Sequence, residues 1–155
     1  MANQGGGAAA MRAAEMEKMT VEQLKMLKEQ TDGEVNLLQD GLNNIRTATS
    51  RLDLAATSLH QLSLRPQGKQ MLVPLTASLY VPATLDDAQN VLVDVGTGYF
   101  IEKTMDEGKD YCQRKINLLK SNYDQLLEIA SKKKVIADEA GVVLQSKLKQ
   151  MASTS

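Results

Sequence analysis

The chain of 155 residues is poor in aromatic residues, cysteine, histidine and proline. It has four Tyr, one Phe and no Trp, although aromatic side chains usually supply much of a globular core by burying ~150–250 Å² each. Its apolar residues are mostly Leu, Ala, Val and Met, which favour helices. The composition therefore disfavours a single aromatic-rich globule and favours an elongated helical protein.

The scarcity of cysteine and histidine excludes several kinds of site. Cys112 has no partner for an internal disulfide, and with His60 it cannot form a Cys/His metal site, so no metal or cofactor is expected. A formal net charge of −1 argues against a general nucleic-acid binder. No apolar run approaches the ~18 residues of a membrane span, and the Gly/Ala-rich residues 1–15 lack a signal peptide's hydrophobic segment. We expect a disordered tail there and a cytoplasmic protein, and we leave a nuclear pool open.

The first long element is a predicted helix over residues 20–64. Thr20-Val21-Glu22-Gln23 has the capping-box pattern, and Arg65-Pro66 is a strong stop. Between them the apolar residues alternate at three and four positions, as in a coiled coil. Five of the six d positions are Leu or Ile, in the series Leu24, Thr31, Leu38, Ile45, Leu52 and Leu59.

A second helix is predicted over residues 104–149, followed by a flexible tail at 151–155. Thr104 and the acidic residues Asp106 and Glu107 suit its first turn. Its d series is Cys112, Leu119, Leu126, Lys133, Ala140 and Lys147. Two helices of similar length joined by a short middle most simply form an antiparallel coiled coil.

The middle, residues 70–103, has the composition of β-strands. Short runs rich in Val, Leu, Tyr and Phe are separated by turn residues, which predicts two hairpins with four short strands. Isolated hairpins are marginally stable in water, so their edges and apolar faces are expected to meet other subunits. The protein is therefore predicted to be a mainly α oligomer.

No group of residues forms a convincing catalytic site. Gly96-Thr97-Gly98 lacks the third glycine and the following helix of a nucleotide-binding loop, and a hairpin turn explains it better. A Cys112–His60 nucleophile pair lacks an orienting third group. We therefore predict that the chain is not an enzyme, and an enzyme built on the glycine pair is the weakest alternative.

The seam between the helices degrades near their free end. Lys28, Thr31, Lys133 and Lys147 occupy core positions there, while apolar residues occur off the seam. Two interpretations stay open. The end is a loosened, Met-rich surface that binds other chains, or the seam shifts register and buries the same residues.

The order helix, two hairpins, helix resembles the α-class subunits of prefoldin, and residues 71–82 and 91–104 look like that family's hairpin signature. The resemblance covers about residues 18–150, within a domain expected over residues 16–150. It implies a hexamer of two α-class and four β-class subunits whose hairpins assemble into an intersubunit β-barrel. It also implies ATP-independent capture of unfolded actin and tubulin at the coiled-coil tips and delivery to the cytosolic chaperonin. No nucleic acid, membrane, cofactor or catalytic residue is implied.

The resemblance and the residue pattern together assign two surfaces. Subunit assembly is assigned to Leu72, Val73, Leu75, Leu79, Tyr80, Val81, Val91, Val93, Tyr99 and Ile101. Client binding is assigned to Met19, Leu24, Met26, Leu27, Val142, Val143, Leu148 and Met151. The alternative function is a structural coiled-coil adaptor in another complex, which would use the same helices without a client surface.

Overall fold

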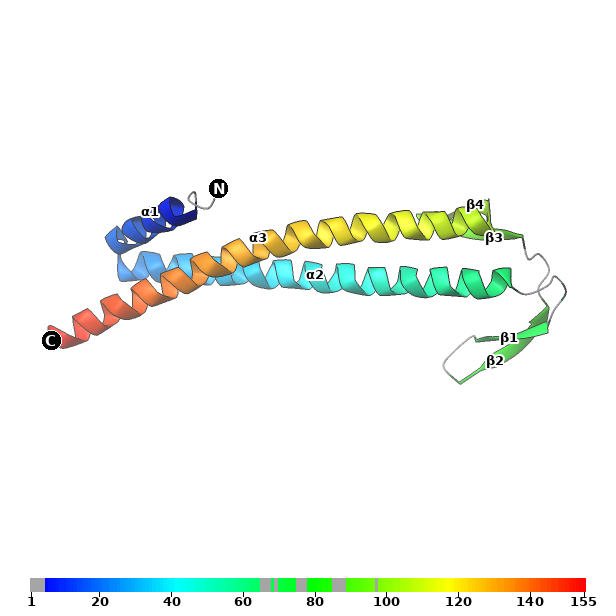
Figure 1. Ribbon diagram of the computed structural model, residues 1–155. Coiled ribbons are helices and arrows are strands. Elements are labelled where there is room, and N and C mark those ends of the chain that lie inside the picture. Colours follow the sequence, from blue (N-terminus) through cyan, green and yellow to red (C-terminus); the bar gives the residue numbers. More distant parts are fainter. Residues whose placement is uncertain (1–4, 65–67, 69, 75–77, 85–88, 97) are drawn as a thin grey trace. The chain divides into compact units, whose positions relative to one another are not determined.

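The computed structural model describes residues 5–64, 68, 70–74, 78–84, 89–96 and 98–155. Its elements are labelled in Figure 1: α1 (Gly5–Lys18), α2 (Val21–Ser63), β1 (Gln70–Pro74), β2 (Tyr80–Thr84), β3 (Asn90–Gly96), β4 (Tyr99–Thr104) and α3 (Met105–Ser153). The described chain is mainly helical, with two antiparallel hairpins of short strands between two long helices. This confirms the predicted fold class, and the intersubunit barrel stays a prediction.

The chain divides into two compact units. The terminal unit comprises Met1–Asn44 and Tyr123–Ser155, and the hairpin unit comprises Ile45–Asn122. Both long helices contribute residues to both units. The terminal unit therefore contains α1 with one part of the α2–α3 pair, and the hairpin unit contains the other part with all four described strands.

The two long helices begin where the capping patterns predict. At α2 the amide of Thr20 donates to Gln23 Oε1 at 3.0 Å, and the amide of Gln23 donates to Thr20 Oγ1 at 3.2 Å. At α3 the amide of Glu107 donates to Thr104 Oγ1 at 3.2 Å. These bonds satisfy amides that have no partner inside the helix.

The N-terminal segment differs from the expectation. Residues 1–15 were expected to be a disordered tail, but α1 spans Gly5–Lys18, so that expectation is corrected for residues 5–15. The physical reason is a run of Ala, Met, Arg, Glu and Lys, all strong helix formers, with no proline. The flexible tail predicted at 151–155 is likewise corrected for residues 151–153, because α3 continues to Ser153.

The core of the terminal unit forms where three helices meet. Met16 of α1, Leu24 of α2 and Ala140 of α3 are buried at 4%, 0% and 0% exposure. Five partly buried residues pack against them: Met19, Leu27, Ile136, Val143 and Leu144. The first helix is therefore part of this core.

Polar residues in the seam of the terminal unit have partners. The side chain of Lys28 passes close to Gly141, since a Cβ added to this glycine would lie 3.3 Å from Lys28 Cε. The ammonium group of Lys28 meets Asp32 Oδ2 at 2.7 Å. Thr31 is buried, and its hydroxyl donates to the carbonyl of Leu27 at 2.7 Å. The polar groups of Lys28 and Thr31 therefore find partners within α2 itself.

Each hairpin of the hairpin unit is a two-stranded antiparallel sheet. β1 pairs with β2 from Gln70–Thr84 to Pro74–Tyr80, and β3 pairs with β4 with a register shift between Asp94 and Gly96. Gly96 and Gly98 have φ of 107° and 81°, values that glycine adopts without strain. The predicted hairpin turn is thus confirmed, because the strand β4 follows it.

The second hairpin is held against its own helices. The amide of Met105 donates to the carbonyl of Gln89 at 3.0 Å. A Cβ at the buried Gly108 would lie 3.0 Å from Val91 Cγ2 and 3.3 Å from Leu59 Cδ1. Gly108 therefore allows β3, α2 and α3 to approach one another closely.

Candidate functional site

The titratable groups offer little for catalysis. The described residues include no group of three or more His, Cys, Asp or Glu side chains placed to ligate a metal ion. His60 is exposed near the end of α2, whereas Cys112 is buried in α3, where burial raises the pKa of its thiol and disfavours the reactive thiolate. Within the described part of the chain, no helix has the length and apolar character to cross a membrane. The candidate sites are therefore surfaces.

The hairpin β3–β4 has one covered face and one open face. Val91 and Val93 are half-buried, and Val91 lies against Gly108 of α3. Strand alternation turns Leu92 and Phe100 to the opposite face, where they are 71% and 60% exposed. The same face carries the exposed acidic residues Asp94 and Glu102. Exposed large apolar side chains on a two-stranded sheet are typical of a surface that another chain covers.

The hairpin β1–β2 repeats this division. Leu72 pairs with Pro82 and Val73 pairs with Val81, so that opposite residues share a face. Leu72 and Tyr80 are 66% and 55% exposed, whereas Val73 is half-buried. The more exposed face is therefore mainly apolar on β1–β2, whereas on β3–β4 it combines apolar and acidic residues.

The predicted assembly residues fall into three groups. The exposed ones are Leu72, Leu79, Tyr80, Val81, Tyr99 and Ile101. Half-buried are Val73, Val91 and Val93, and Leu75 lies outside the described residues. The sequence reasoning missed Leu92 and Phe100. The signal that could have found them is alternation in β3, because an inward Val91 turns Leu92 outward.

The eight predicted client-binding residues divide into two groups of four. Leu24 is fully buried, and Met19, Leu27 and Val143 pack against the buried cluster. The exposed members are Met26 (71%), Val142 (70%), Leu148 (41%) and Met151 (60%). Half of the group therefore forms part of a core and half stays on the surface, and client binding stays a prediction. Val135, which is 47% exposed, was not assigned to the group.

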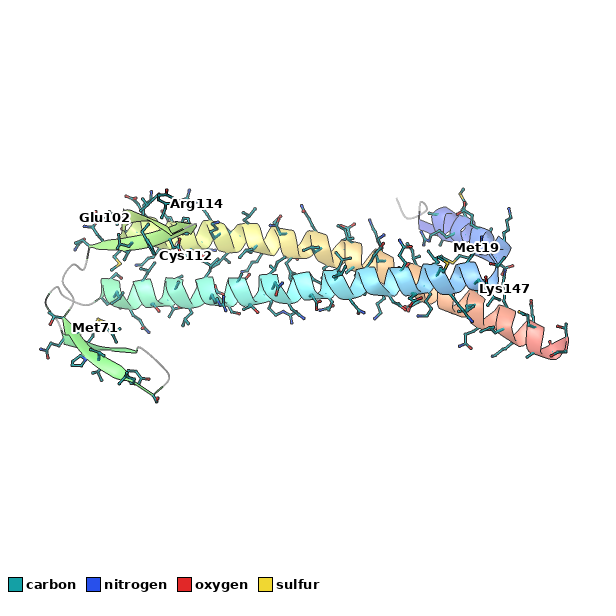
Figure 2. All side chains as sticks on the ribbon, turned by 180° about the vertical axis from the view of Figure 1, so that it is seen from behind. Met19, Met71, Glu102, Cys112, Arg114 and Lys147 are labelled. Atoms are coloured by element: carbon teal, nitrogen blue, oxygen red, sulfur yellow. The ribbon has the colours of Figure 1, made fainter. Side chains whose placement is uncertain are left out.

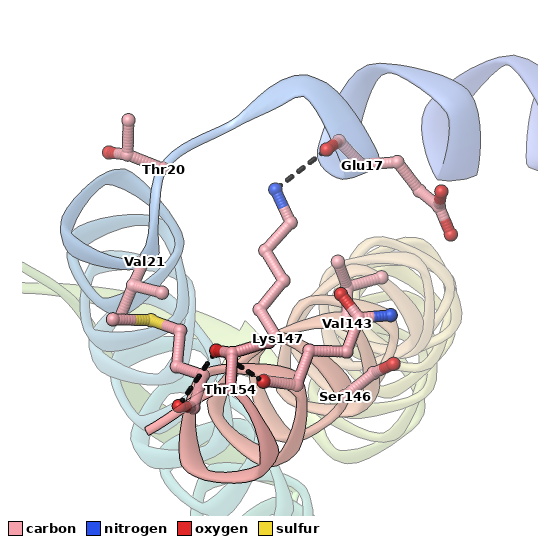
Figure 3. Close-up of a pocket in the computed structure, with 9 residues that line it drawn as sticks. Glu17, Thr20, Val21, Val143, Ser146, Lys147 and Thr154 are labelled. Atoms are coloured by element: carbon pink, nitrogen blue, oxygen red, sulfur yellow. Dashed lines mark hydrogen bonds between the residues drawn. The ribbon is translucent and has the colours of Figure 1, made fainter.

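An open pocket of about 530 Å³ lies between the end of α1, the start of α2 and α3 (Figure 3). Lys147 extends from α3 across it, and its Nζ donates to the carbonyl of Glu17 at 2.6 Å and to the carbonyl of Met19. Figure 2 shows Lys147 and Met19 at the same end of the terminal unit. Val143 and Met151 add apolar surface to the wall of this pocket.

Two ion pairs join elements of the terminal unit. The guanidinium of Arg12 meets the carboxylate of Glu139 through Nε at 3.3 Å and Nη2 at 3.4 Å, which links α1 to α3. Lys133 Nζ lies 2.8 Å from Glu34 Oε2 and links α3 to α2. The hydrogen bond from Lys133 is the main cause that lowers the pKa of Glu34, and Gln30 and the charge of Lys133 act in the same direction.

Comparisons with known proteins agree with this arrangement. A family model described as "Prefoldin subunit" matches residues 31–150. The chain is 76% identical to prefoldin subunit 5 of Arabidopsis thaliana, over 91% of this chain and 93% of that protein. It is 34% identical to prefoldin subunit 5 of Homo sapiens, over 88% of each chain.

A solved structure supports the fold independently of close sequence similarity. The filamentous PFD of Methanocaldococcus jannaschii, determined by cryo-EM, matches with a TM-score of 0.64 at 17% identity, over 84% of this chain and 99% of that one. Its likeness concerns the fold alone. Prefoldin subunits are chaperone components and not enzymes, and the similarity to subunit 5 confirms the resemblance seen in the hairpin segments. The chain therefore belongs to the prefoldin subunit family.

Proposed function

We propose that this chain is an α-class subunit of a cytoplasmic prefoldin hexamer, together with one further α-class and four β-class subunits. The complex captures unfolded actin and tubulin without ATP and passes them to the cytosolic chaperonin. The single observation that carries the proposal is that each unit of a chain with the prefoldin fold leaves large apolar side chains exposed.

The hairpin surface supports assembly. Its exposed apolar face includes Leu72, Tyr80, Leu92 and Phe100, and the two-stranded sheets leave strand edges without backbone partners within the sheet. Burying a Leu or Phe side chain contributes ~1.5–3 kcal/mol, so the three residues of these types together favour association strongly. Hairpins of neighbouring subunits would complete the sheets into a barrel, which removes the edges.

The terminal unit supports capture. Met26, Val142, Leu148 and Met151 are exposed at several places on α2 and α3 of the terminal unit, and flexible methionine side chains adapt to different apolar partners. Each contact is weak. Several such surfaces in one complex would bind one client together, and the higher effective concentration raises the overall affinity. Reversible multivalent binding of this kind needs no ATP.

The proposal is tested with the native complex isolated through this chain. Its mass should correspond to six subunits, and it should suppress aggregation of guanidine-denatured actin on dilution. Serine at Met26, Val142, Leu148 and Met151 should weaken suppression without changing the mass. Serine at Leu54 and Leu118, which are exposed in the hairpin unit, is the control.

The outcomes separate the proposal from its alternative. A dimer or trimer without effect on actin aggregation would indicate a structural coiled-coil adaptor. A hexamer in which the four serine substitutions leave suppression undiminished would contradict the assignment of the capture surface. Loss of suppression in the Leu54 and Leu118 control would show that general surface apolarity, and not this group, carries the effect.

A further inference from the structure

One narrow stripe of the first helix lies on apolar residues of α2 and α3 in the terminal unit. We call the apolar surface under this helix the groove. Ala9, Arg12, Met16 and Met19 follow one another at helical spacing, and all four are covered to some degree, whereas their neighbours are exposed. Met11, on another side of the helix, is 68% exposed. The helix therefore rests on the surface of the α2–α3 pair and is not enclosed by it.

The groove under α1 consists of residues that belong to the predicted client-binding group or adjoin it. Met16 is the apolar anchor, buried against Leu24 and Ala140. Around this contact lie Leu27, Ile136, Val143 and Leu144. An apolar groove that accepts one face of a helix is a recurring way of binding a peptide segment.

The polar contacts of α1 do not depend on a unique sequence. Lys147 donates to two main-chain carbonyls, those of Glu17 and Met19, and a carbonyl is present in any polypeptide. The side-chain contribution is a pair of hydrogen bonds from the guanidinium of Arg12 to the carboxylate of Glu139. Arg12 lies four residues before the apolar anchor. The groove thus matches a short helix with an apolar residue, a basic residue one turn earlier and free carbonyls at its end.

Several features make it easy for α1 to detach from the groove and bind again. The helix has 14 residues and begins with three glycines, and isolated helices shorter than ~12–15 residues are marginal in water. The side chains of Arg12 and Glu139 are 37% and 29% exposed, so solvent screens their attraction. One buried methionine is the main apolar contribution of α1 to the cluster.

We propose that α1 is an internal competitor that occupies a client-binding groove and is displaced by an unfolded chain. This inference rests on the proposed capture function and names the class of segment bound: a short amphipathic helix with an apolar anchor and a basic residue one turn before it. A docked α1 lowers the apparent affinity for clients in proportion to the fraction of time for which the groove is free. Displacement exposes the groove only when a client segment replaces the helix, which limits unwanted association of the apolar surface.

The test uses the native complex isolated through this chain, with labelled guanidine-denatured actin as the probe. Met16→Ser should release α1 and lower the apparent Kd for the probe by about three- to tenfold, because the docked fraction falls. Met11→Ser changes an exposed methionine of the same helix and should leave the Kd within about twofold. Arg12→Ala should change the Kd in the same direction as Met16→Ser, by a smaller factor.

Hydrogen exchange of the unmodified complex gives a second measurement that does not depend on any variant. Addition of the probe should accelerate exchange of the α1 amides, because the displaced helix loses its support. An unchanged or slower exchange of α1 in the probe-bound complex would overturn the proposal. Equal Kd values for Met16→Ser and Met11→Ser, or weaker binding by Met16→Ser, would overturn it as well.

Failure of this inference is distinguishable from failure of the capture function. In one outcome, the unmodified complex binds the probe and serine at Met26, Val142, Leu148 and Met151 reduces binding. In that case the capture function is confirmed, and the Kd and exchange measurements test the role of α1 alone. If the unmodified complex and the Met16→Ser complex both fail to bind the probe, the capture function itself is wrong and the competitor proposal falls with it.

Discussion

The two units of this chain bury their apolar residues in different ways. The terminal unit brings three helices together, and its central residues Leu24 and Ala140 are fully covered by its own chain. The hairpin unit has two sheets of two strands each, on which Leu92 and Tyr99 stay more than 70% exposed. The helices of the hairpin unit also bury Met105, Cys112 and Ile116, so the difference lies in its sheets, whose large apolar side chains this chain leaves uncovered.

The largest effect is expected from removing the open face of the second hairpin. Leu92→Ser with Phe100→Ser should exclude the chain from its complex, since each side chain loses ~1.5–3 kcal/mol of burial at the interface. Native mass of material isolated through a tag on this chain measures the effect. Leu118→Ser, an exposed leucine of α3, is the control. If the complex isolated through the double variant kept its full mass, the proposed role of the hairpins in assembly would be contradicted, because the hairpins would then not need neighbours.

A core substitution in the terminal unit should act on stability and not on assembly. Leu24→Ala removes a fully buried side chain and should cost about 2–5 kcal/mol of local stability. Leu37→Ala, at a leucine that is 72% exposed, should change stability by less than about 0.5 kcal/mol. Hydrogen-exchange protection of the terminal unit in the native complex measures both. Loss of the chain from the complex in Leu24→Ala would show that the two units are not independent.

Two glycine substitutions should have opposite signs. Gly108→Ala places a Cβ 3.0 Å from Val91 Cγ2 and should destabilise the hairpin unit by about 1–3 kcal/mol through overpacking. Gly33→Ala meets nothing within 4 Å in α2 and should stabilise the terminal unit by up to about 1 kcal/mol. Hydrogen exchange of each unit measures the difference. Adding Val91→Ala to Gly108→Ala should restore part of the loss, and the absence of such rescue would contradict the proposed close approach.

The smallest effect concerns the ion pair between α2 and α3 in the terminal unit. Because Lys133 lowers the pKa of Glu34, the ionised pair stabilises the fold above the ordinary carboxyl pKa, and this contribution is lost as the pH falls through the lowered value. Lys133→Gln should raise the pKa of Glu34 toward its ordinary range. A carboxyl-carbon NMR titration measures it. An unchanged pKa would assign the shift to Gln30 instead.

Local patterns were sufficient to predict much of the fold. The reciprocal bonds between Thr20 and Gln23 follow from their spacing, and the turn at Gly96 follows from a glycine pair between strand-like runs. These predictions succeeded because the interacting groups are close in sequence. The helical segment over residues 5–15 was missed because its glycines suggested disorder, although the following alanines favour a helix.

The candidate surfaces were harder to predict, because exposure depends on residues far apart in the chain. Heptad spacing places Leu24 in the seam and Met26 outside it, but only folding shows that Met16 of the first helix also covers the leucine together with Ala140. In the same way, the open face of β3 is defined by Gly108, which admits Val91 and leaves Leu92 outside.

By itself the sequence determined the long helices, the two hairpins and the prefoldin resemblance, because heptad spacing, caps and turn residues act over a few positions. Only the tertiary structure decided that α1 covers part of the predicted client surface and which face of each hairpin is open. The physical reason is that burial belongs to a set of side chains brought together by folding. A residue's own type and its neighbours in sequence do not specify what will pack against it.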